Sequence, residues 1–187
     1  MMRQDRFTEQ AQAVLQASQE MVRQSRHPQW DVEHVFLSLV QLKDGLAQEI
    51  LQKTGINPES LGSAIKKQLE IVPKLGGDVV QIYTTPRVVG LLERANAEAE
   101  RLQDEYVGVE HLLIAIADER EGDSAKILNE FEITKERIYQ ALRDIRGSAR
   151  VDSPNAESNY QALARFSIDL TELALSLIHI LTLPTKA

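Results

Sequence analysis

Apolar residues recur at helical spacing in two long stretches of the chain. In the first, small or apolar side chains fall three and four residues apart from Ala11 to Ser25. The second has the same spacing, at Leu91, Leu92, Ala95, Ala99 and Leu102. Each stretch predicts an amphipathic helix with one side turned to a core. Thr8, followed by the acidic Glu9, is typical of the residues that cap a helix start.

Three shorter helical segments follow each long one. In the first set, Asp31 precedes an apolar stripe, and Gly45 and Gly55 interrupt the pattern. Pro58 stands where a fourth helix would begin, a position that proline tolerates well. The predicted core residues of these three helices are Val32, Val35, Phe36, Leu39, Val40, Ile50, Leu51, Leu61, Ile65 and Leu69.

The two sets of helices are copies of one another. They align without a gap at an offset of 77 residues, so that the Val-Glu-His triplet at 32–34 recurs at 109–111. The repeats are predicted at about 7–69 and 84–146, with a connector at 70–83. One copy would be marginal alone. We therefore predict an all-α fold over residues 1–147, in which two four-helix repeats pack with pseudo-twofold symmetry.

The chain after the second repeat divides into three parts. A polar stretch at 148–155 predicts a linker, and the pattern over 156–174 predicts a further helix. Residues 175–187 form a nearly uncharged apolar run and then a short polar end. That run is too short to span a bilayer.

Charge and composition exclude several classes of protein. The 187 residues include 28 acidic and 21 basic side chains, for a net charge of −7. Such a chain, without a Lys/Arg cluster, is a poor match to nucleic acid or to an anionic membrane. The absence of cysteine excludes disulfides and thiolate metal sites. The first residues, MMRQDRFTEQ, do not form a signal sequence, so we expect a cytoplasmic protein.

The motifs of common catalytic sites are absent from the sequence. It has no phosphate-binding G-x-x-x-x-G-K-[ST] loop, no G-x-S-x-G nucleophile turn and no H-E-x-x-H pair. His34 and His111 occupy equivalent repeat positions near helix starts, where packing or capping explains them better than metal binding. We therefore expect no catalytic, cofactor-binding or metal-ligating residues, no cofactor, and no enzymatic activity.

The repeat resembles a known family. The segments FTEQA at 7–11 and VEH at 32–34, then YTTPR at 83–87 and YVGVEHLL at 106–113, are similar to the double Clp N-terminal repeat of the Clp/Hsp100 AAA+ unfoldases. The resemblance covers about residues 3–174. The segments AESNYQAL at 156–163 and DLTELA at 169–174 resemble the ClpB-type disaggregases of that family. Residues 175–187 depart from the family pattern, and we interpret them as a non-native tail.

The resemblance implies a non-catalytic accessory domain. It would capture exposed apolar segments of unfolded or aggregated polypeptides and deliver them to the AAA+ ring of the parent protein. ATP hydrolysis and hexamer formation belong to modules beyond residue 174, so the isolated fragment is expected to be a monomer. Two alternatives stay open: docking of a folded adaptor protein, as in ClpA- and ClpC-like unfoldases, and regulation of the ring without contact to substrate.

The resemblance also implies a substrate-binding groove. The positions of this chain that match it are Thr8, Leu92, Asp104 and Glu110. Each has a plainer interpretation: Thr8 as an N-cap, Leu92 as core, Asp104 as a residue after a helix end. Glu110 would lie in the first turn of a helix, where the dipole favours a carboxylate.

Overall fold

The first four helices form as the apolar pattern predicts. A computed structural model describes residues 6–76, 81–159 and 161–162. The elements of the first repeat are α1 (Glu9–Ser25), β1 (Gln29–Trp30), α2 (Val32–Gln41), α3 (Leu46–Lys53) and α4 (Pro58–Glu70). Thr8 caps α1 by accepting a hydrogen bond from the backbone N–H of Ala11 at 3.2 Å. Asp31 caps α2: its side chain accepts a hydrogen bond from the backbone N–H of Val32 at 2.8 Å.

The second repeat reproduces the first. Its elements are β2 (Tyr83–Thr84), α5 (Pro86–Leu102), α6 (Val109–Ala117), α7 (Gly122–Glu130) and α8 (Lys135–Arg146). An offset of 77 converts the bounds of α1 into those of α5, and those of the other helices within one residue. The predicted all-α fold of two four-helix repeats is confirmed.

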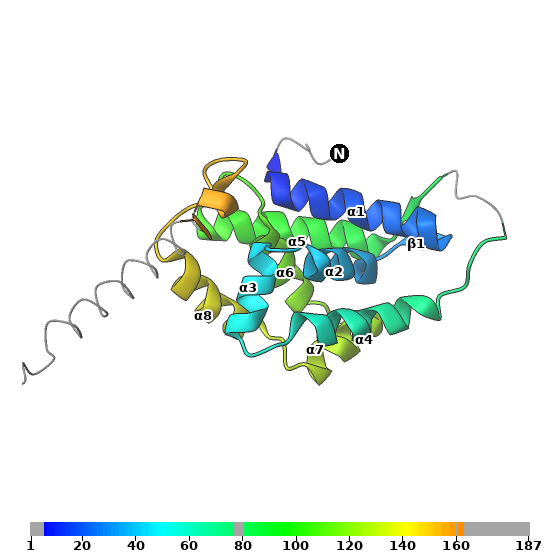
Figure 1. Ribbon diagram of the computed structural model, residues 1–187. Helices are drawn as coiled ribbons and strands as arrows, with labels where there is room; N and C mark the ends of the chain where they lie inside the picture. Colours follow the sequence, from blue (N-terminus) through cyan, green and yellow to red (C-terminus); the bar gives the residue numbers. More distant parts are fainter. Residues whose placement is uncertain (1–5, 77–80, 160, 163–187) are drawn as a thin grey trace, which may run out of the picture.

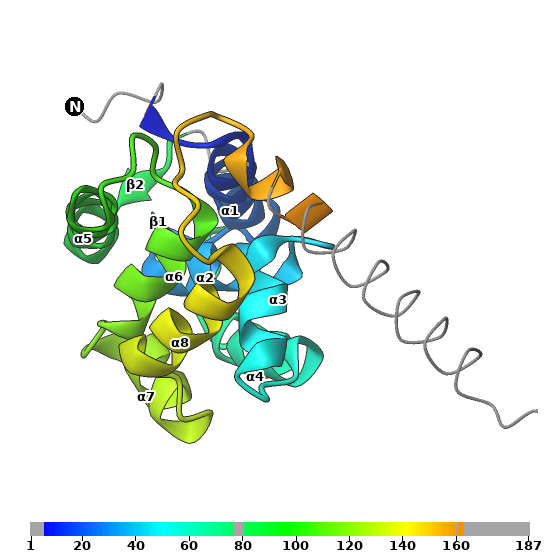
Figure 2. The ribbon, with the colours of Figure 1, turned by 90° about the vertical axis from the view of Figure 1, so that its left-hand side faces the viewer.

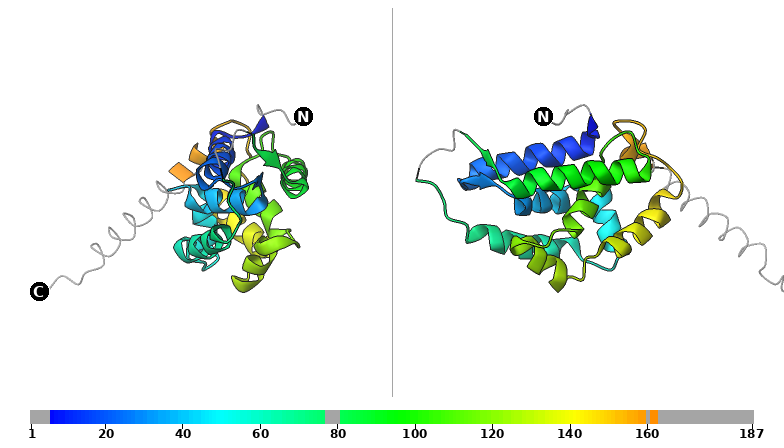
Figure 3. Two further views of the ribbon diagram at one scale, coloured as in Figure 1. Left: turned by 90° about the vertical axis from the view of Figure 1, so that its right-hand side faces the viewer. Right: turned by 180° about the vertical axis from the view of Figure 1, so that it is seen from behind.

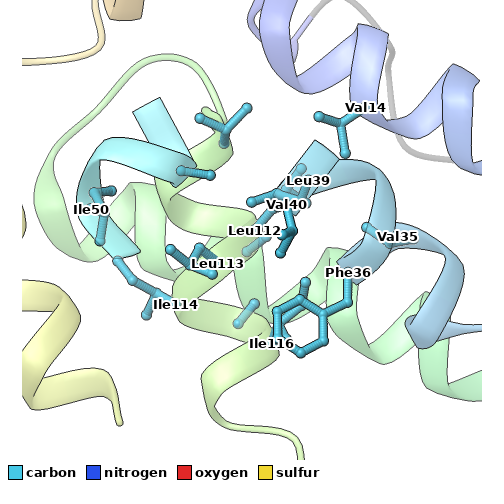
Figure 4. Close-up of a cluster of buried hydrophobic side chains, with 14 of the residues drawn as sticks. Val14, Val35, Phe36, Leu39, Val40, Ile50, Leu112, Leu113, Ile114 and Ile116 are labelled. Carbon is cyan, nitrogen blue, oxygen red and sulfur yellow. The ribbon is translucent and has the colours of Figure 1, made fainter. Parts of the chain in front are cut away.

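The helices α2 and α6 form the centre of the molecule. Every residue from Val32 to Val40 is buried, as is every residue from Val109 to Ile116. The sequence predicts a single apolar stripe on α2. The structure instead buries α2 on all sides, because α1, α3, α4 and α6 all pack against it. Figure 4 shows the shared core, in which side chains of both repeats interdigitate.

A pseudo-twofold axis relates the repeats. Helix α3 of the first repeat packs on α8 of the second, and α4 of the first packs on α7 of the second, which is the exchange that a twofold axis requires. The long helices α1 and α5 lie on one side of the core, with α4, α7 and α8 on the other (Figure 1). Figure 3 shows the same arrangement from behind. No helix in the described part of the chain is long and apolar enough to cross a membrane.

Short parallel bridges join the repeats at two places. Trp30 of β1 pairs with Thr84 of β2, and Phe7 pairs with Val107, the same pair after exchange of the repeats. The start of each long helix is thereby tied to the other repeat. The backbone N–H of Thr85 donates to the Trp30 carbonyl, and that of Thr8 donates to the Val107 carbonyl, both at 3.1 Å.

The predicted C-terminal helix begins at Ala156, and residues 156–159 and 161–162 are helical. The rest of that prediction, residues 163–174, lies outside the described residues. So does the segment 175–187 that the sequence marks as a departure from the family pattern.

Candidate functional site

A half-buried and a buried carboxylate, Asp31 and Glu33, lie at the start of α2. Arg87, in the first turn of α5, contacts Asp31 at 3.0 Å and Glu33 at 2.9 Å. Ser124 donates to the same oxygen, Oε1, through its backbone N–H at 3.0 Å and its hydroxyl at 2.8 Å, while Nη1 of Arg87 donates to Oε2 at 3.2 Å. Burial alone would raise the pKa of Glu33, but the hydrogen bonds from Arg87 and Ser124 hold it below its ordinary value.

A second carboxylate cluster lies at the equivalent place, the start of α6. It contains three of the predicted site residues, Thr8, Asp104 and Glu110, all of them buried. Arg146 of α8 pairs with Asp104 and lies 3.5 Å from Glu110. Asp104 also faces Nε2 of His111 at 3.0 Å. The structure therefore brings these three residues together, in a network of buried polar groups.

Glu157 completes this second cluster from the far end of the chain. Its Oε1 accepts hydrogen bonds from the Thr8 hydroxyl at 2.5 Å and from the backbone N–H of Val109 at 3.2 Å. In the first repeat, Oδ1 of Asp31 makes the same two bonds, with Thr85 and Val32. The residue that matches Asp31 in the second repeat is Gly108. Glu157 thus supplies the carboxylate that Gly108 lacks.

The two clusters differ in the cations that pair with their carboxylates. Arg87 stands between Asp31 and Glu33, but the matching residue in the first repeat is the neutral Gln10. In the part of the chain that the structure describes, no cation stands against Glu157 as Arg87 does against Glu33. Burial together with the charge of Glu110 raises the pKa of Glu157 to about 7. Among the described residues, its Oε2 atom is buried and has no hydrogen-bond partner.

The paired histidines serve as helix caps. Nδ1 of His34 accepts from the backbone N–H of Asp31 at 3.1 Å, and Nδ1 of His111 accepts from Gly108 at 2.8 Å. The capping role that the sequence favours for them is confirmed. Burial, followed by the neighbouring His27, lowers the pKa of His34 to about 4. In the described ranges, no three His, Cys, Asp or Glu side chains are placed to hold a metal ion.

Leu92 lies away from the other predicted site residues. It is partly buried on α5, ten residues before the helix end, or roughly 15 Å along the axis. Val89 lies one turn earlier on the same helix face and is 47% exposed. Tyr83 of β2, just before α5, is 60% exposed. The sequence predicts that Leu92 lies with the other three site residues in one groove. The structure instead places Leu92 on an apolar surface of α5 and the other three in a buried polar cluster beyond the end of that helix.

Sequence reasoning missed Arg146 and Glu157. A signal for Glu157 was present: the repeat aligns Asp31 with Gly108, so one capping carboxylate was unaccounted for. Nothing in the local sequence indicates which distant residue replaces it.

The chain is similar to proteins of one family. Residues 6–131 match the family described as Clp repeat (R) N-terminal domain. The chaperone protein ClpB of Bacillus anthracis is 34% identical over 169 residues, which cover 89% of this chain and 19% of that protein. ClpB of Rhodopirellula baltica is 38% identical over 173 residues, covering 92% of this chain and 19% of that protein. The chain thus spans about a fifth of the length of these relatives.

Solved structures share the fold. The Hsp104 N-terminal domain of Candida albicans superposes with a TM-score of 0.72 at 19% identity, covering 81% of this chain and 98% of that domain. A ClpV N-domain solved in complex with a VipB peptide gives a TM-score of 0.62 at 16% identity, covering 78% and 89%. The repeat, the fold and the match over residues 6–131 agree, and the chain belongs to the Clp repeat (R) N-terminal domain family.

Proposed function

We propose that this domain captures exposed apolar segments of unfolded or aggregated polypeptides and passes them to the AAA+ ring of a ClpB-type disaggregase. The observation that carries the proposal is the apolar surface of Val89 and Leu92 on α5, in a domain whose relatives are ClpB chaperones. The ClpV N-domain solved with a VipB peptide supports peptide binding by this fold. The ring and its ATPase activity lie outside this chain.

The physical basis of capture is the burial of apolar surface. Each Å² of apolar surface that leaves water contributes about 25 cal/mol. The exposed parts of Val89 and Leu92 offer a small area, so binding to any one segment should be weak and tolerant of sequence. The net charge of −7 favours segments that also carry Lys or Arg. Weak, broad binding suits a domain that must accept many unfolded chains and release them.

Substitutions on α5 test the proposal. We expect Leu92→Asp and Val89→Asp to weaken binding to a fluorescently labelled, permanently unfolded protein at least tenfold, measured by anisotropy. Ala97→Asp is the matched control, because Ala97 is exposed on the same helix but turned well away from Leu92. Circular dichroism checks that each variant folds. Equal binding by all three variants would contradict a capture surface on α5.

The same assay separates the adaptor-docking alternative. A docking domain would ignore the unfolded protein and bind one folded partner tightly, with saturation at a fixed ratio. A capture domain should respond to unrelated unfolded chains with similar affinity.

A further inference from the structure

Residues 151–159 and 161–162 cross the ends of several helices. The carbonyl of Val151 accepts from the backbone N–H groups of Glu105 and Tyr106 at 2.9 and 3.1 Å. Farther along, the carbonyl of Pro154 accepts from Glu9 at 2.7 Å. Figure 2 shows this segment in orange, passing from the end of α8 across the start of α6 to the start of α1. The side-chain amide of Gln161 then donates to the carbonyl of Asp44, before α3, at 3.1 Å.

We propose that residues 151–159 and 161–162 form a releasable strap, latched by the Glu157 carboxyl, that covers Thr8 and Glu110 when docked and uncovers them when it leaves. What release does for substrate rests on the proposed function together with the family resemblance, which places Thr8 and Glu110 in a substrate-binding groove. The docking and release of the strap stand on the contacts alone.

Glu157 acts as the latch of the strap. Glu157 places one oxygen between the Thr8 hydroxyl and the first N–H of α6, and thereby joins the starts of two helices from different repeats. The same two bonds in the other half of the molecule are made by Asp31, which is fixed in place beside α2. The latch of the second half therefore sits on a segment that can leave without unfolding either repeat.

The contacts that hold the strap on the domain are weak. Among its described residues, the buried apolar side chains are Val151 and Ala156. Two such small side chains contribute only a few kcal/mol of apolar burial. Its other contacts are hydrogen bonds, which water can replace at a net cost of about 1 kcal/mol each. Because the free energy that holds the strap is small, the protonation state of the buried Glu157 carboxyl shifts the docking equilibrium.

Charged groups from α6 and α8 lie around Glu157. From α6 it faces Glu110 and the positive end of the helix, and beyond Glu110 stand His111 and Arg146 of α8, which both pair with Asp104. From α1 it faces the neutral Thr8, with Glu9 next in the chain. Arg146 is already shared between two carboxylates. Burial and the charge of Glu110 outweigh the hydrogen bonds from Thr8 and Val109, which favour the charged carboxylate, so the pKa of Glu157 is raised.

Docking of the strap should weaken as the pH rises. Burial and Glu110 raise the pKa of docked Glu157 to about 7, whereas a released glutamate titrates near 4.5. Between these values the docked strap holds a proton that the released strap has lost, so docking weakens as pH rises through 7. The docking equilibrium constant should fall about tenfold between pH 6 and pH 8 and change little above pH 8.

Amide hydrogen exchange of the full chain measures docking directly. Four backbone N–H groups, those of Glu9, Glu105, Tyr106 and Val109, donate to the strap. We expect their protection, corrected for the intrinsic rate, to fall about tenfold from pH 6 to pH 8. The N–H groups of Val32 and Thr85 are internal controls that should not change. Val32 makes the bond to Asp31 that is equivalent to the bond from Val109 to Glu157, and Thr85 donates to the Trp30 carbonyl, so neither bond involves the strap.

Two variants make the test decisive. Glu157→Gln keeps the oxygen that accepts from Thr8 and Val109 but does not titrate, so protection should stay high and flat across the pH range. Gly108→Asp supplies the missing carboxylate beside α6 and should displace the strap, so that the four amides lose protection at both pH values while the controls keep theirs. Constant protection in the unaltered protein, or an equal pH slope in Glu157→Gln, would overturn the proposal. No substrate is present, so failure here is distinct from failure of capture.

Discussion

Glu33 of the first repeat and Arg87 of the second form an ion pair at 2.9 Å that joins the two halves of the molecule. The position equivalent to Glu33 is Glu110, but the position equivalent to Arg87 is Gln10. The twofold-related sites thus share a carboxylate and differ in the cation that faces it. In one half, Arg87 pairs with both carboxylates. In the other, Arg146 pairs with Asp104 and with Glu110 at 3.5 Å, and the buried Glu157 lies beside Glu110.

This difference predicts unequal costs for the same substitution. Glu33→Gln should lower the free energy of unfolding by about 3 kcal/mol, because it removes one of the two carboxylate charges that pair with the partly buried Arg87 and leaves it Asp31 and the Glu121 carbonyl. Glu110→Gln should cost less than half of that, since it also removes the repulsion on Glu157, and Arg146 keeps Asp104. Urea unfolding of both variants at pH 7 gives the comparison. Equal losses would show that the two clusters are not electrostatically different.

The capping histidine of α2 predicts acid sensitivity. The pKa of His34 is about 4 in the folded state and near 6.5 in an unfolded chain. Between these values the unfolded chain binds more protons, so stability falls as pH drops from 6.5 towards 4, by up to about 3 kcal/mol. His34→Gln keeps a side-chain acceptor for the cap and removes the titration. Its stability should fall less than that of the unaltered protein between pH 6.5 and 5, and a parallel fall would exclude His34 as the cause.

The close approach of carboxylates to Gly108 predicts the effect of adding a side chain there. A Cβ at this position would lie 2.2 Å from Oε2 of Glu110 and 2.8 Å from Oε1 of Glu157. Its φ of −90° is ordinary, so the cost of Gly108→Ala comes from displaced carboxylates, and we expect a loss of roughly 1–3 kcal/mol.

The matched change is Gly62→Ala inside α4. There a Cβ finds its nearest neighbour at 3.6 Å, and the helix gains about 0.5–1 kcal/mol from the more helix-favouring residue. Thermal unfolding should therefore move in opposite directions for the two variants. A stabilised Gly108→Ala would mean that the carboxylates relocate freely.

Local patterns were sufficient to predict the helices. The caps at Thr8 and Asp31, the proline at the start of α4 and the spacing of apolar residues are all short-range signals. The repeat predicted how the helices are arranged in space, because two equal copies of this size bury their apolar faces most simply around a twofold axis.

The polar site could not be predicted in the same way. Asp104 and Arg146 are 42 residues apart, and Thr8 and Glu157 are 149 apart, so no spacing rule connects them. The family resemblance selected Thr8, Asp104 and Glu110, but it could not show that residues 151–159 would lie across them. The parallel bridges at Phe7 and Trp30 were likewise invisible, because each depends on the meeting of two repeats rather than on strand propensity.

The most direct test of capture is an NMR titration of the full chain with a permanently unfolded protein at pH 8, where the strap is predicted to be least docked. The account predicts shifts of the amide signals along α5 around Val89 and Leu92, with weaker shifts at Thr8 and Glu110. Signals that stay unchanged at millimolar ligand, or that shift only on α4 and α7, would contradict the claim that this domain captures apolar segments through α5.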